Sequence, residues 1–251
     1  MLPEEENNSN KIEQSEPLLE RKDAPVSDIP LWKRIVLFVV GLGGLYLIAL
    51  LVSIPAIFVP TEYQDSFVNI VTYVVLFCAL VGIVVLDIPK HLSMFKKCLP
   101  YLIGFGLGAG IIVFDIFYTT IVSQFYKYSI NENEEGVRSI IDVMPVAAVF
   151  VLGIIGPLCE ELTYRVGLFG ALKKVSVILA YIVTIIVFGA IHFRFNSSNI
   201  YNELVNLPVY LVSGAVLTFA YDKWGFTASA TAHITNNLYA ILMNIILKYI
   251  S

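Results

Sequence analysis

Long apolar runs separated by short polar segments dominate the chain from residue 31 onward. A helix of about 20 apolar residues, at ~1.5 Å per residue, crosses the hydrocarbon core of a bilayer. We therefore expect an all-α fold, a polytopic transmembrane helix bundle with about seven spans, and the pattern is also compatible with six or eight. The predicted spans cover roughly 35–59, 67–86, 99–126, 144–169, 176–194, 204–221 and 226–248.

The fourth run is too long for one regular span if it continues to Lys173. It contains Gly153, Gly156 and Pro157 directly before two glutamates. Proline removes a backbone donor and interrupts the helical hydrogen-bond ladder. We expect the helix to be distorted just before the glutamates.

Composition agrees with a membrane protein. Hydrophobic residues make up 57% of the chain and charged residues only 14%, whereas about a quarter of residues are charged in soluble domains. The mean hydropathy is +0.78. Residues 1–30 hold eight acidic and three basic residues, a net charge of −5, and the remainder holds twelve acidic and thirteen basic residues, a net charge of +1. The chain has no concentration of Lys and Arg that would attract nucleic acid, so the composition excludes a nucleic-acid partner.

These features predict two regions. Residues 1–30 are expected to be a disordered, acidic cytoplasmic tail, because they are rich in Glu, Asn, Ser and Pro. Residues 31–251 are expected to be the transmembrane domain, with a catalytic core at about 140–245. The lipid bilayer is then an obligatory partner, and the predicted location is the cell membrane.

The distribution of Lys and Arg predicts the orientation, since short cytoplasmic loops carry an excess of both. Basic residues precede the first span and follow the second, fourth and sixth spans, while the alternate loops hold few. The amino terminus is therefore predicted to be cytoplasmic and the carboxyl terminus outside. The basic residues on the predicted cytoplasmic side are Lys33, Arg34, Lys90, Lys96, Lys97, Lys173, Lys174 and Lys223.

Charged residues interrupt the fourth apolar run at Glu160, Glu161 and Arg165. Ionisable groups at bilayer depth cost at least a few kcal/mol (about 2.5–3.5 on insertion scales) and are usually functional. Glu161 and Arg165 are four residues apart, so they share a helix face and can form an ion pair. Glu160, rotated by ~100°, is then free to be the reactive carboxylate. The competing interpretation is an ion-paired packing node.

Two of the three histidines also lie in apolar spans. His192 follows Phe188 by one helical turn, and the aromatic ring can wall its pocket. His233 precedes Asn237 by one turn, which puts an imidazole and a carboxamide on one face. Each alone is equally typical of interfacial or interhelical hydrogen bonding. Counted from the cytoplasmic ends at ~1.5 Å per residue, Glu160, His192 and His233 lie about 18, 24 and 12 Å deep, so the three spans can converge on one site.

Together these groups favour a water-activating hydrolase. Glu160 is suited to take a proton from water. His192 is suited to hold that water, and His233 and Asn237 to donate hydrogen bonds to the oxyanion that forms on an attacked amide carbonyl. No serine or cysteine recurs with these elements, and Cys159 is interpreted as a core residue.

The combination of Glu-Glu-x-x-x-Arg, Phe-x-x-x-His and His-x-x-x-Asn, in this order, resembles the CAAX protease and bacteriocin-processing (CPBP/Abi) family, which includes type II CAAX prenyl endopeptidases. The resemblance covers residues ~140–245. It implies an intramembrane endopeptidase built as a helix bundle around a cavity open toward the cytoplasmic side. The functional residues that it implies are Glu160, Glu161, Arg165, His192, His233 and Asn237.

Several alternatives stay open. A zinc-dependent mechanism is possible with two His and two Glu, but we favour a route with no cofactor, because pairing with Arg165 occupies Glu161 and Asn237 is a poor zinc ligand. The substrate class is a membrane-associated peptide or protein: a CAAX protein, a pheromone precursor or a bacteriocin leader. A non-proteolytic immunity or scaffolding protein and a small-solute transporter are the competing functions. The polar residues Asp115, Thr163, Tyr164 and Asn206 are expected to line the site or to pack.

Overall fold

The computed structural model describes residues 29–127 and 129–250, and in that part the regular secondary structure is helical throughout. The predicted tail at residues 1–30 lies outside the described residues except for Ile29 and Pro30. The helical elements are α1 (Leu31–Ala56), α2 (Thr61–Val84), α3 (Ile88–His91), η1 (Leu92–Lys96), α4 (Cys98–Phe125), α5 (Glu132–Val143), α6 (Pro145–Phe150), η2 (Val151–Ile155), α7 (Gly156–Glu160), η3 (Glu161–Phe169), α8 (Gly170–Leu172), α9 (Val177–Ile191), α10 (Ile200–Trp224) and α11 (Phe226–Ile250).

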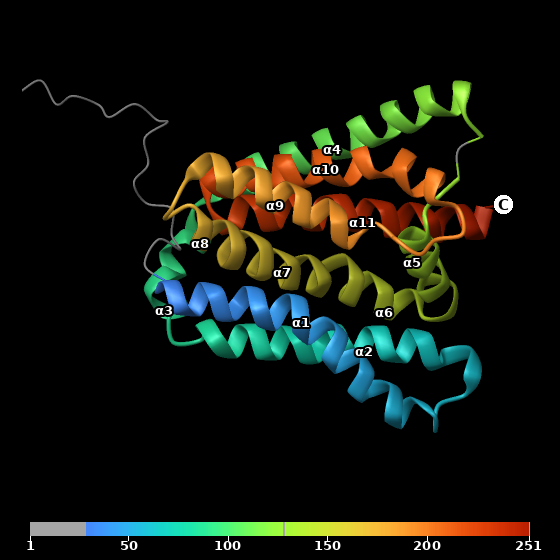
Figure 1. Ribbon diagram of the computed structural model, residues 1–251, viewed down its shortest axis with the longest axis horizontal. Helices are drawn as coiled ribbons and strands as arrows, with labels where there is room; N and C mark the ends of the chain where they lie inside the picture. The colour runs from blue at the N-terminus through green and yellow to red at the C-terminus, as the bar shows by residue number, and fades with distance from the viewer. Residues whose placement is uncertain (1–28, 128, 251) are drawn as a thin grey trace, which may run out of the picture.

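In the described part of the chain seven passes run along the bundle, in agreement with the prediction of about seven spans (Figure 1). They are formed by α1, α2, α4, the continuous run from α6 to α8, α9, α10 and α11. Five of these, all except α9 and α11, are long and apolar enough to cross a membrane. The chain enters the bundle at the end that holds α3 and α8, and α11 leaves it at the opposite end.

The fourth pass is distorted at the predicted place. Two π-helical stretches, η2 at Val151–Ile155 and η3 at Glu161–Phe169, flank the short helix α7, and Pro157 lies in the first turn of α7. A π-helical turn is wider than an α-helical turn and is common at functional sites. The distortion therefore extends beyond the proline and includes the segment of Glu161 and Arg165.

Glycines allow close helix packing next to this pass. A methyl group on Gly104 or Gly108 of α4 would lie 2.5 and 2.6 Å from the carbonyl oxygens of Ala228 and Ala232 in α11. The two backbones are in contact there, as expected for small residues one turn apart in membrane helices. This contact closes the half of the bundle in which α11 begins.

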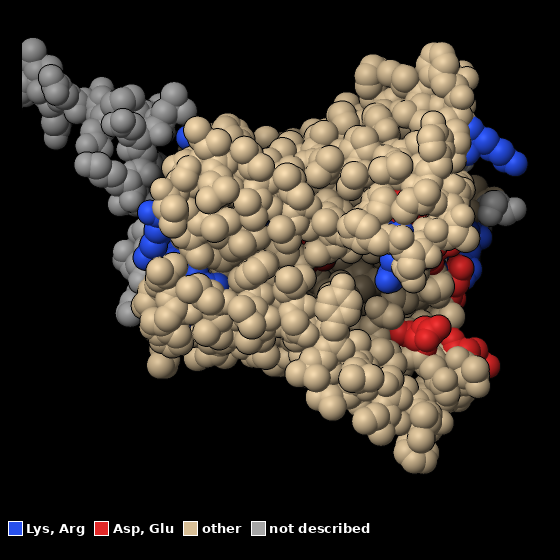
Figure 2. Space-filling view, in the orientation of Figure 1, with Lys and Arg blue, Asp and Glu red and all other residues tan. Residues whose placement is uncertain are grey.

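Many large apolar side chains are exposed on the outside of the bundle. Phe58 and Phe125, for example, are 87% and 88% exposed. In the view of Figure 2, charged side chains gather at its two ends. Such a surface suits lipid, and the chain is a multi-pass membrane protein.

The two ends differ in charge. Among the described residues the end where α1 begins, here the basic end, has Lys33, Arg34, Lys96, Lys97, Lys173, Lys174 and Lys223 against Asp87 and Asp222. The opposite end, here the acidic end, has Glu62, Asp65, Glu132, Glu134, Glu135, Asp142 and Glu203 against Lys127, Arg138, Arg194 and Lys248. This distribution agrees with the prediction, from the positive-inside rule, that the basic end is the cytoplasmic one.

Candidate active site

Glu161, at the start of η3, is the centre of a buried polar cluster. Its side chain is fully buried, and Oε1 lies 3.1 Å from Nη1 of the equally buried Arg165. Oε1 also lies 2.9 Å from Nδ1 of His233, and Oε2 accepts a hydrogen bond from Ser229 Oγ at 2.5 Å. The predicted Glu161–Arg165 ion pair is therefore present, and Glu161 also fixes two side chains of α11.

Arg165 is held by more than this pair. The 3.1 Å contact with Glu161 is not a linear hydrogen bond, because none of the three guanidinium nitrogens meets hydrogen-bond geometry in the described part of the chain. The guanidinium lies over the ring of Phe188, with Cζ 4.3 Å from its centroid. Charge attraction and a cation–π contact thus stabilise a cation that is taken out of water.

Glu160, one residue earlier, faces a cavity. Its side chain is 16% exposed, and its Oε2 has no hydrogen-bond partner among the described residues. That oxygen lies 3.7 Å from Nε2 of His233, too far for a direct hydrogen bond. The prediction that the pairing of Glu161 leaves its neighbour free agrees with this geometry.

His233 lies between the two glutamates. It comes from the second turn of α11, and Ser229 lies one turn before it on the same face. Because a carboxylate only accepts, Nδ1 carries a proton toward Glu161, and Nε2 is the nitrogen that faces Glu160. The ring is therefore oriented by one carboxylate toward the other.

His192 directly follows α9. Its Nδ1 lies 2.8 Å from the carbonyl oxygen of Phe188 and so carries the proton, which leaves Nε2 as the acceptor in the neutral ring. The ring stacks on Tyr210 of α10, with centroids 4.5 Å apart and planes at 16°. The backbone carbonyl of His192 accepts a hydrogen bond from Asn131, and Asn131 Oδ1 accepts one from the Tyr210 hydroxyl.

Phe188 connects the two histidines. Its ring centroid lies 4.9 Å from that of His192, 5.8 Å from that of His233 and 5.9 Å from that of Tyr164. The ring is 2% exposed and also carries the Arg165 contact. The predicted role as a wall of the histidine pocket agrees with these contacts.

Asn237 lies one turn beyond His233 and lines the same cavity as both histidines. Its Nδ2 donates to the carbonyl oxygen of Leu152 in η2, at 3.3 Å. A carboxamide has two N–H bonds, so one remains for another acceptor. Asn236, its neighbour, lines this cavity as well.

Two cavities meet at His192. The larger, here the amide cavity, has a volume of about 540 Å³ and is lined by His233, Asn237 and Asn244 of α11 and by polar residues of α4, α5 and α10. The smaller, here the carboxylate cavity, has about 290 Å³ and is lined by Glu160, Tyr164 and residues of α1 and α2. Figure 2 shows the surface hollowed beside the acidic side chains.

Both cavities extend toward the acidic end. Asn133 of α5 lines both cavities, and Asn244 near the end of α11 lines the larger. In the other direction, α4 and α11 are in backbone contact at Gly104 and Gly108. The expected opening toward the cytoplasmic side therefore stays a prediction, since it depends on which end of the bundle is cytoplasmic.

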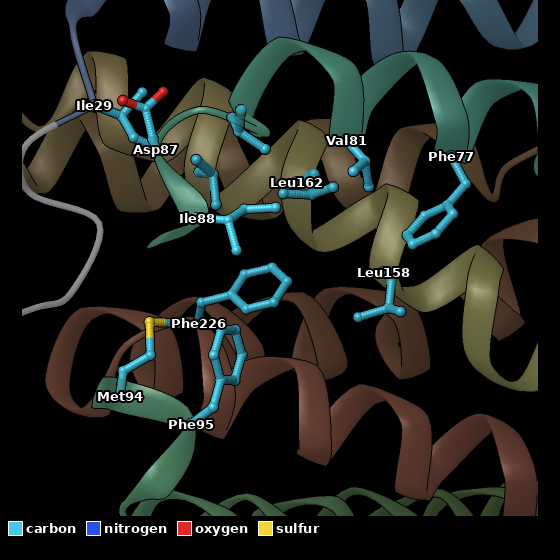
Figure 3. A pocket seen from close by; sticks show the side chains of 12 residues that line it. Ile29, Phe77, Val81, Asp87, Ile88, Met94, Phe95, Leu158, Leu162 and Phe226 are labelled. Atoms are coloured by element: carbon cyan, nitrogen blue, oxygen red, sulfur yellow. The ribbon is translucent and has the colours of Figure 1, made fainter. Parts of the chain in front are cut away.

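A third hollow, here the apolar groove, lies near the basic end (Figure 3). It has a volume of about 290 Å³. Apolar side chains such as Phe77, Val81, Leu158 and Leu162 line it, and among its described lining residues Asp87 is the one that is charged. No catalytic candidate is among its described lining residues, since Leu158 and Leu162 lie on another face of the helix that carries Glu160.

The side chains do not fit a zinc site in this arrangement. In the part of the chain that the structure describes, no three His, Cys, Asp or Glu side chains lie together as metal ligands. Glu161 is also occupied by Arg165, Ser229 and His233. Zinc sites in proteins use three or four such ligands, and these side chains do not supply them together.

Several residues at the site were not predicted. Ser229, Tyr210 and Asn131 each contact a candidate catalytic residue. Ser229 is four residues before His233, and that spacing is the one signal in the sequence that points to it. Of the residues expected to line or pack at the site, Asp115 and Asn206 line the amide cavity, and Thr163 and Tyr164 line the carboxylate cavity. Cys159 is buried, as predicted.

Comparison with known proteins supports the resemblance. Residues 142–239 match the sequence profile of a family described as "Type II CAAX prenyl endopeptidase Rce1-like". All six candidate residues lie inside this range. No solved structure matches.

Curated relatives are distant. The chain is 25% identical to the putative membrane peptidase YdiL of Bacillus subtilis, over 49% of this chain and 48% of that protein. It is 27% identical to the membrane-embedded CAAX protease MroQ of Staphylococcus aureus, over 50% and 49% of the two chains. It is 25% identical to the UPF0177 protein YvdC of Lactococcus lactis, over 64% and 58%. The match spans about half the length of these relatives.

Proposed function

Since the chain carries the Rce1-like CAAX endopeptidase family sequence over residues 142–239, we propose that it is an intramembrane endopeptidase that uses a glutamate-activated water. The observation that supports this best is the carboxylate of Glu160. The side chain borders the carboxylate cavity, and its buried Oε2 has no hydrogen-bond partner among the described residues and lies 3.7 Å from an imidazole that Glu161 holds in place.

Water is activated between Glu160 and His192. One hydrogen of the water points to the Glu160 carboxylate and the other to Nε2 of His192, which is an acceptor because Nδ1 donates to the Phe188 carbonyl. Glu160 takes a proton as the water oxygen attacks the carbonyl carbon of the substrate. A positioned general base of this kind contributes about 10²–10⁴ in rate.

The developing oxyanion is stabilised from α11. Asn237 donates from its second N–H, the one that does not bond to Leu152, and His233 donates from Nε2 while its Nδ1 stays on Glu161. Such donors stabilise charge that is absent in the bound substrate, so they act on the transition state.

The intermediate then collapses. The C–N bond breaks as Glu160 returns its proton to the departing nitrogen, which leaves a carboxylic acid on one product and an amine on the other; the acid then passes its proton to the amine, giving a carboxylate and an ammonium group. Glu160 regains its starting state, and Glu161 and Arg165 keep their buried pair throughout. Glu161 and Arg165 are therefore positioning residues, and Glu160, His192, His233 and Asn237 contact the reacting atoms.

The substrate proposed is a membrane-associated peptide or protein. Two relatives are named as a putative membrane peptidase and a CAAX protease, and a site inside a bundle of membrane-spanning helices suits a substrate held at the bilayer. We favour hydrolysis without a metal, because Glu161 and His233 are occupied by each other and by their other contacts.

The test is mass spectrometry of membrane peptides from cells with the intact chain and with Glu160→Gln. Cleavage products present with the intact chain are expected to be absent with the variant. Glu62→Gln, an exposed glutamate at the acidic end, is the matched control and is expected to leave the products unchanged. Identical peptides from the intact chain and Glu160→Gln would favour a non-proteolytic role. Metal content measured on active protein tests the zinc alternative.

A further inference from the structure

The backbone at His192 is not held by a continuing helix. α9 ends at Ile191, and the chain after His192 is irregular up to Asn199, which caps α10. The last carbonyl groups of a helix have no partner within that helix. Partners from other parts of the chain must therefore fix the direction in which the His192 ring leaves the backbone.

Two buried side chains supply such partners. Asn131, which is 1% exposed, donates from Nδ2 to the carbonyl oxygen of His192 at 3.1 Å. Glu203, also 1% exposed, accepts a hydrogen bond through Oε2 from the backbone N–H of Arg194 at 3.1 Å. The chain is thus held at the histidine itself and again two residues later.

Glu203 also joins these two points of attachment. Its Oε1 accepts a hydrogen bond from the backbone N–H of Glu132 at 3.0 Å, and Glu132 directly follows Asn131. Neither segment can therefore move without breaking a bond to the other. We name this closed set of contacts the Glu203 clamp; its members are Asn131, Glu132, His192, Arg194 and Glu203.

Stabilisation of α10 does not account for the direction of the Glu203 side chain. The residue lies in the first turn of α10, where a negative charge favours the helix. Both of its hydrogen bonds, however, go to N–H groups outside α10. The carboxylate therefore connects two other segments, and α10 is the base from which it does so.

The same end of α10 holds the segment before Glu132. Asn202 Nδ2 donates to the carbonyl oxygen of Ile130 at 2.8 Å, and Asn206 Nδ2 donates to that of Ser129 at 3.0 Å. Both asparagines are buried. The clamp is thus attached to a long helix on the side of residues 129–132.

With its backbone fixed, His192 keeps only the rotation of its side chain. The bond from Nδ1 to the Phe188 carbonyl and the stacking on Tyr210 restrict that rotation. Tyr210 lies seven residues, about two turns, after Glu203 on α10. One helix therefore carries both the stacking ring and the carboxylate of the clamp.

We infer that Glu203 is a positioning residue for His192, with Asn131 as its partner. The clamp keeps Nε2 of His192 an acceptor for the water that Glu160 activates, since both side chains border the carboxylate cavity. The effect on cleavage rests on the proposed function, whereas the effect on the ring can be measured without activity.

Two variants break the clamp. Glu203→Gln puts an NH₂ group in place of one accepting oxygen, and that group cannot accept from a backbone N–H. Asn131→Asp keeps the oxygen that caps α5 but loses the donor to His192. Asp87→Asn is the control, because it makes the same change from carboxylate to carboxamide in a buried side chain at the basic end.

The first readout is the tautomer of the His192 ring, measured by ¹⁵N NMR of the full-length chain with labelled histidine in detergent. The chain has three histidines, and His192→Gln identifies the signal. The intact chain and Asp87→Asn are expected to show the proton on Nδ1 alone. Both clamp variants are expected to show a second form with the proton on Nε2, because the hydrogen bond at Nδ1 sets the tautomer.

Three results would overturn the inference: mixed tautomers in the intact chain, an unchanged ring in the clamp variants, or the same change in Asp87→Asn. Loss of stability alone does not select His192, so the control separates positioning from a general loosening of the bundle. The two clamp variants lie on different segments, so one of them can fail to fold without loss of the test.

The second readout is the yield of the peptides that depend on Glu160. A catalytic group displaced by about 1 Å can cost about 10² in rate, so at equal protein levels we expect a fall of about tenfold or more in both clamp variants. Asp87→Asn is expected to leave the yield unchanged. Normal yields from both clamp variants would contradict positioning for cleavage. If no such peptides exist, the proposed function fails, and the NMR result still decides whether the clamp holds the ring.

Discussion

The Glu161 carboxylate lies 2.9 Å from Nδ1 of His233 and thereby turns Nε2 of that ring toward Glu160. Two adjacent glutamates consequently have different tasks. One orients an imidazole from inside the protein, and the other borders the carboxylate cavity. Replacement of each glutamate should separate these tasks.

Glu160→Gln is expected to lower kcat by about 10²–10⁴, because the amide cannot take a proton from water. The unfolding temperature should change little, since Oε2 has no hydrogen-bond partner in the described part of the chain. Peptide cleavage and thermal unfolding of purified protein in detergent check both points. A variant with normal cleavage would contradict the role of Glu160.

Glu161→Gln is expected to lower the free energy of unfolding by about 3–5 kcal/mol, because it leaves Arg165 as an uncompensated buried charge. The matched control is Glu134→Gln, which breaks an i, i+4 Glu–Arg pair with Arg138 at the surface, where the two side chains are 34% and 46% exposed. A surface pair contributes only about 0–1 kcal/mol. Equal losses in the two variants would contradict a structural role for the buried pair.

Ser229→Ala removes a hydrogen bond to the Glu161 carboxylate. A hydrogen bond to a charged group is worth about 1.5–3 kcal/mol, so we expect the unfolding temperature to fall and kcat to fall about tenfold as His233 loses its alignment. Ser139→Ala is the control, because the Ser139 hydroxyl bonds only to the backbone of its own helix in an exposed position. If both variants behave alike, Ser229 does not support the site.

Tyr210→Phe and Tyr210→Leu separate two contacts of Tyr210. The phenylalanine variant keeps the ring that stacks on His192 but loses the hydroxyl bond to Asn131. We expect a modest fall in kcat for phenylalanine, equivalent to about 1 kcal/mol, and a larger fall for leucine. Cleavage rates at saturating substrate measure kcat. Wild-type rates in both variants would exclude a positioning role.

Gly108→Ala is expected to destabilise the bundle, because its methyl group would lie 2.6 Å from the carbonyl oxygen of Ala232. Gly110→Ala, two residues later on the same helix, places its methyl group in open space. Alanine favours a helix over glycine by about 1 kcal/mol, so this control should be neutral or stabilising. The unfolding temperatures of the two variants are compared. Equal changes in unfolding temperature would contradict close packing of α4 on α11.

Much of the site could be predicted from spacing along one helix. Glu161 and Arg165 are four residues apart in one segment, and their ion pair is present even though the segment is π-helical. The Phe188–His192 contact arises in the same way. Asn131 and Tyr210 could not be predicted, since 79 residues separate them and neither belongs to a motif.

The apolar pattern by itself determined the seven helical passes of the described residues and their boundaries to within a few residues, because each depends on the length of a local segment. Only the tertiary structure decided that His233 lies between the two glutamates and that the cavities open toward the acidic end. Those features depend on how each helix is rotated and tilted against its neighbours. Contacts such as that of Gly108 with Ala232 set these angles, and they join residues far apart in the chain.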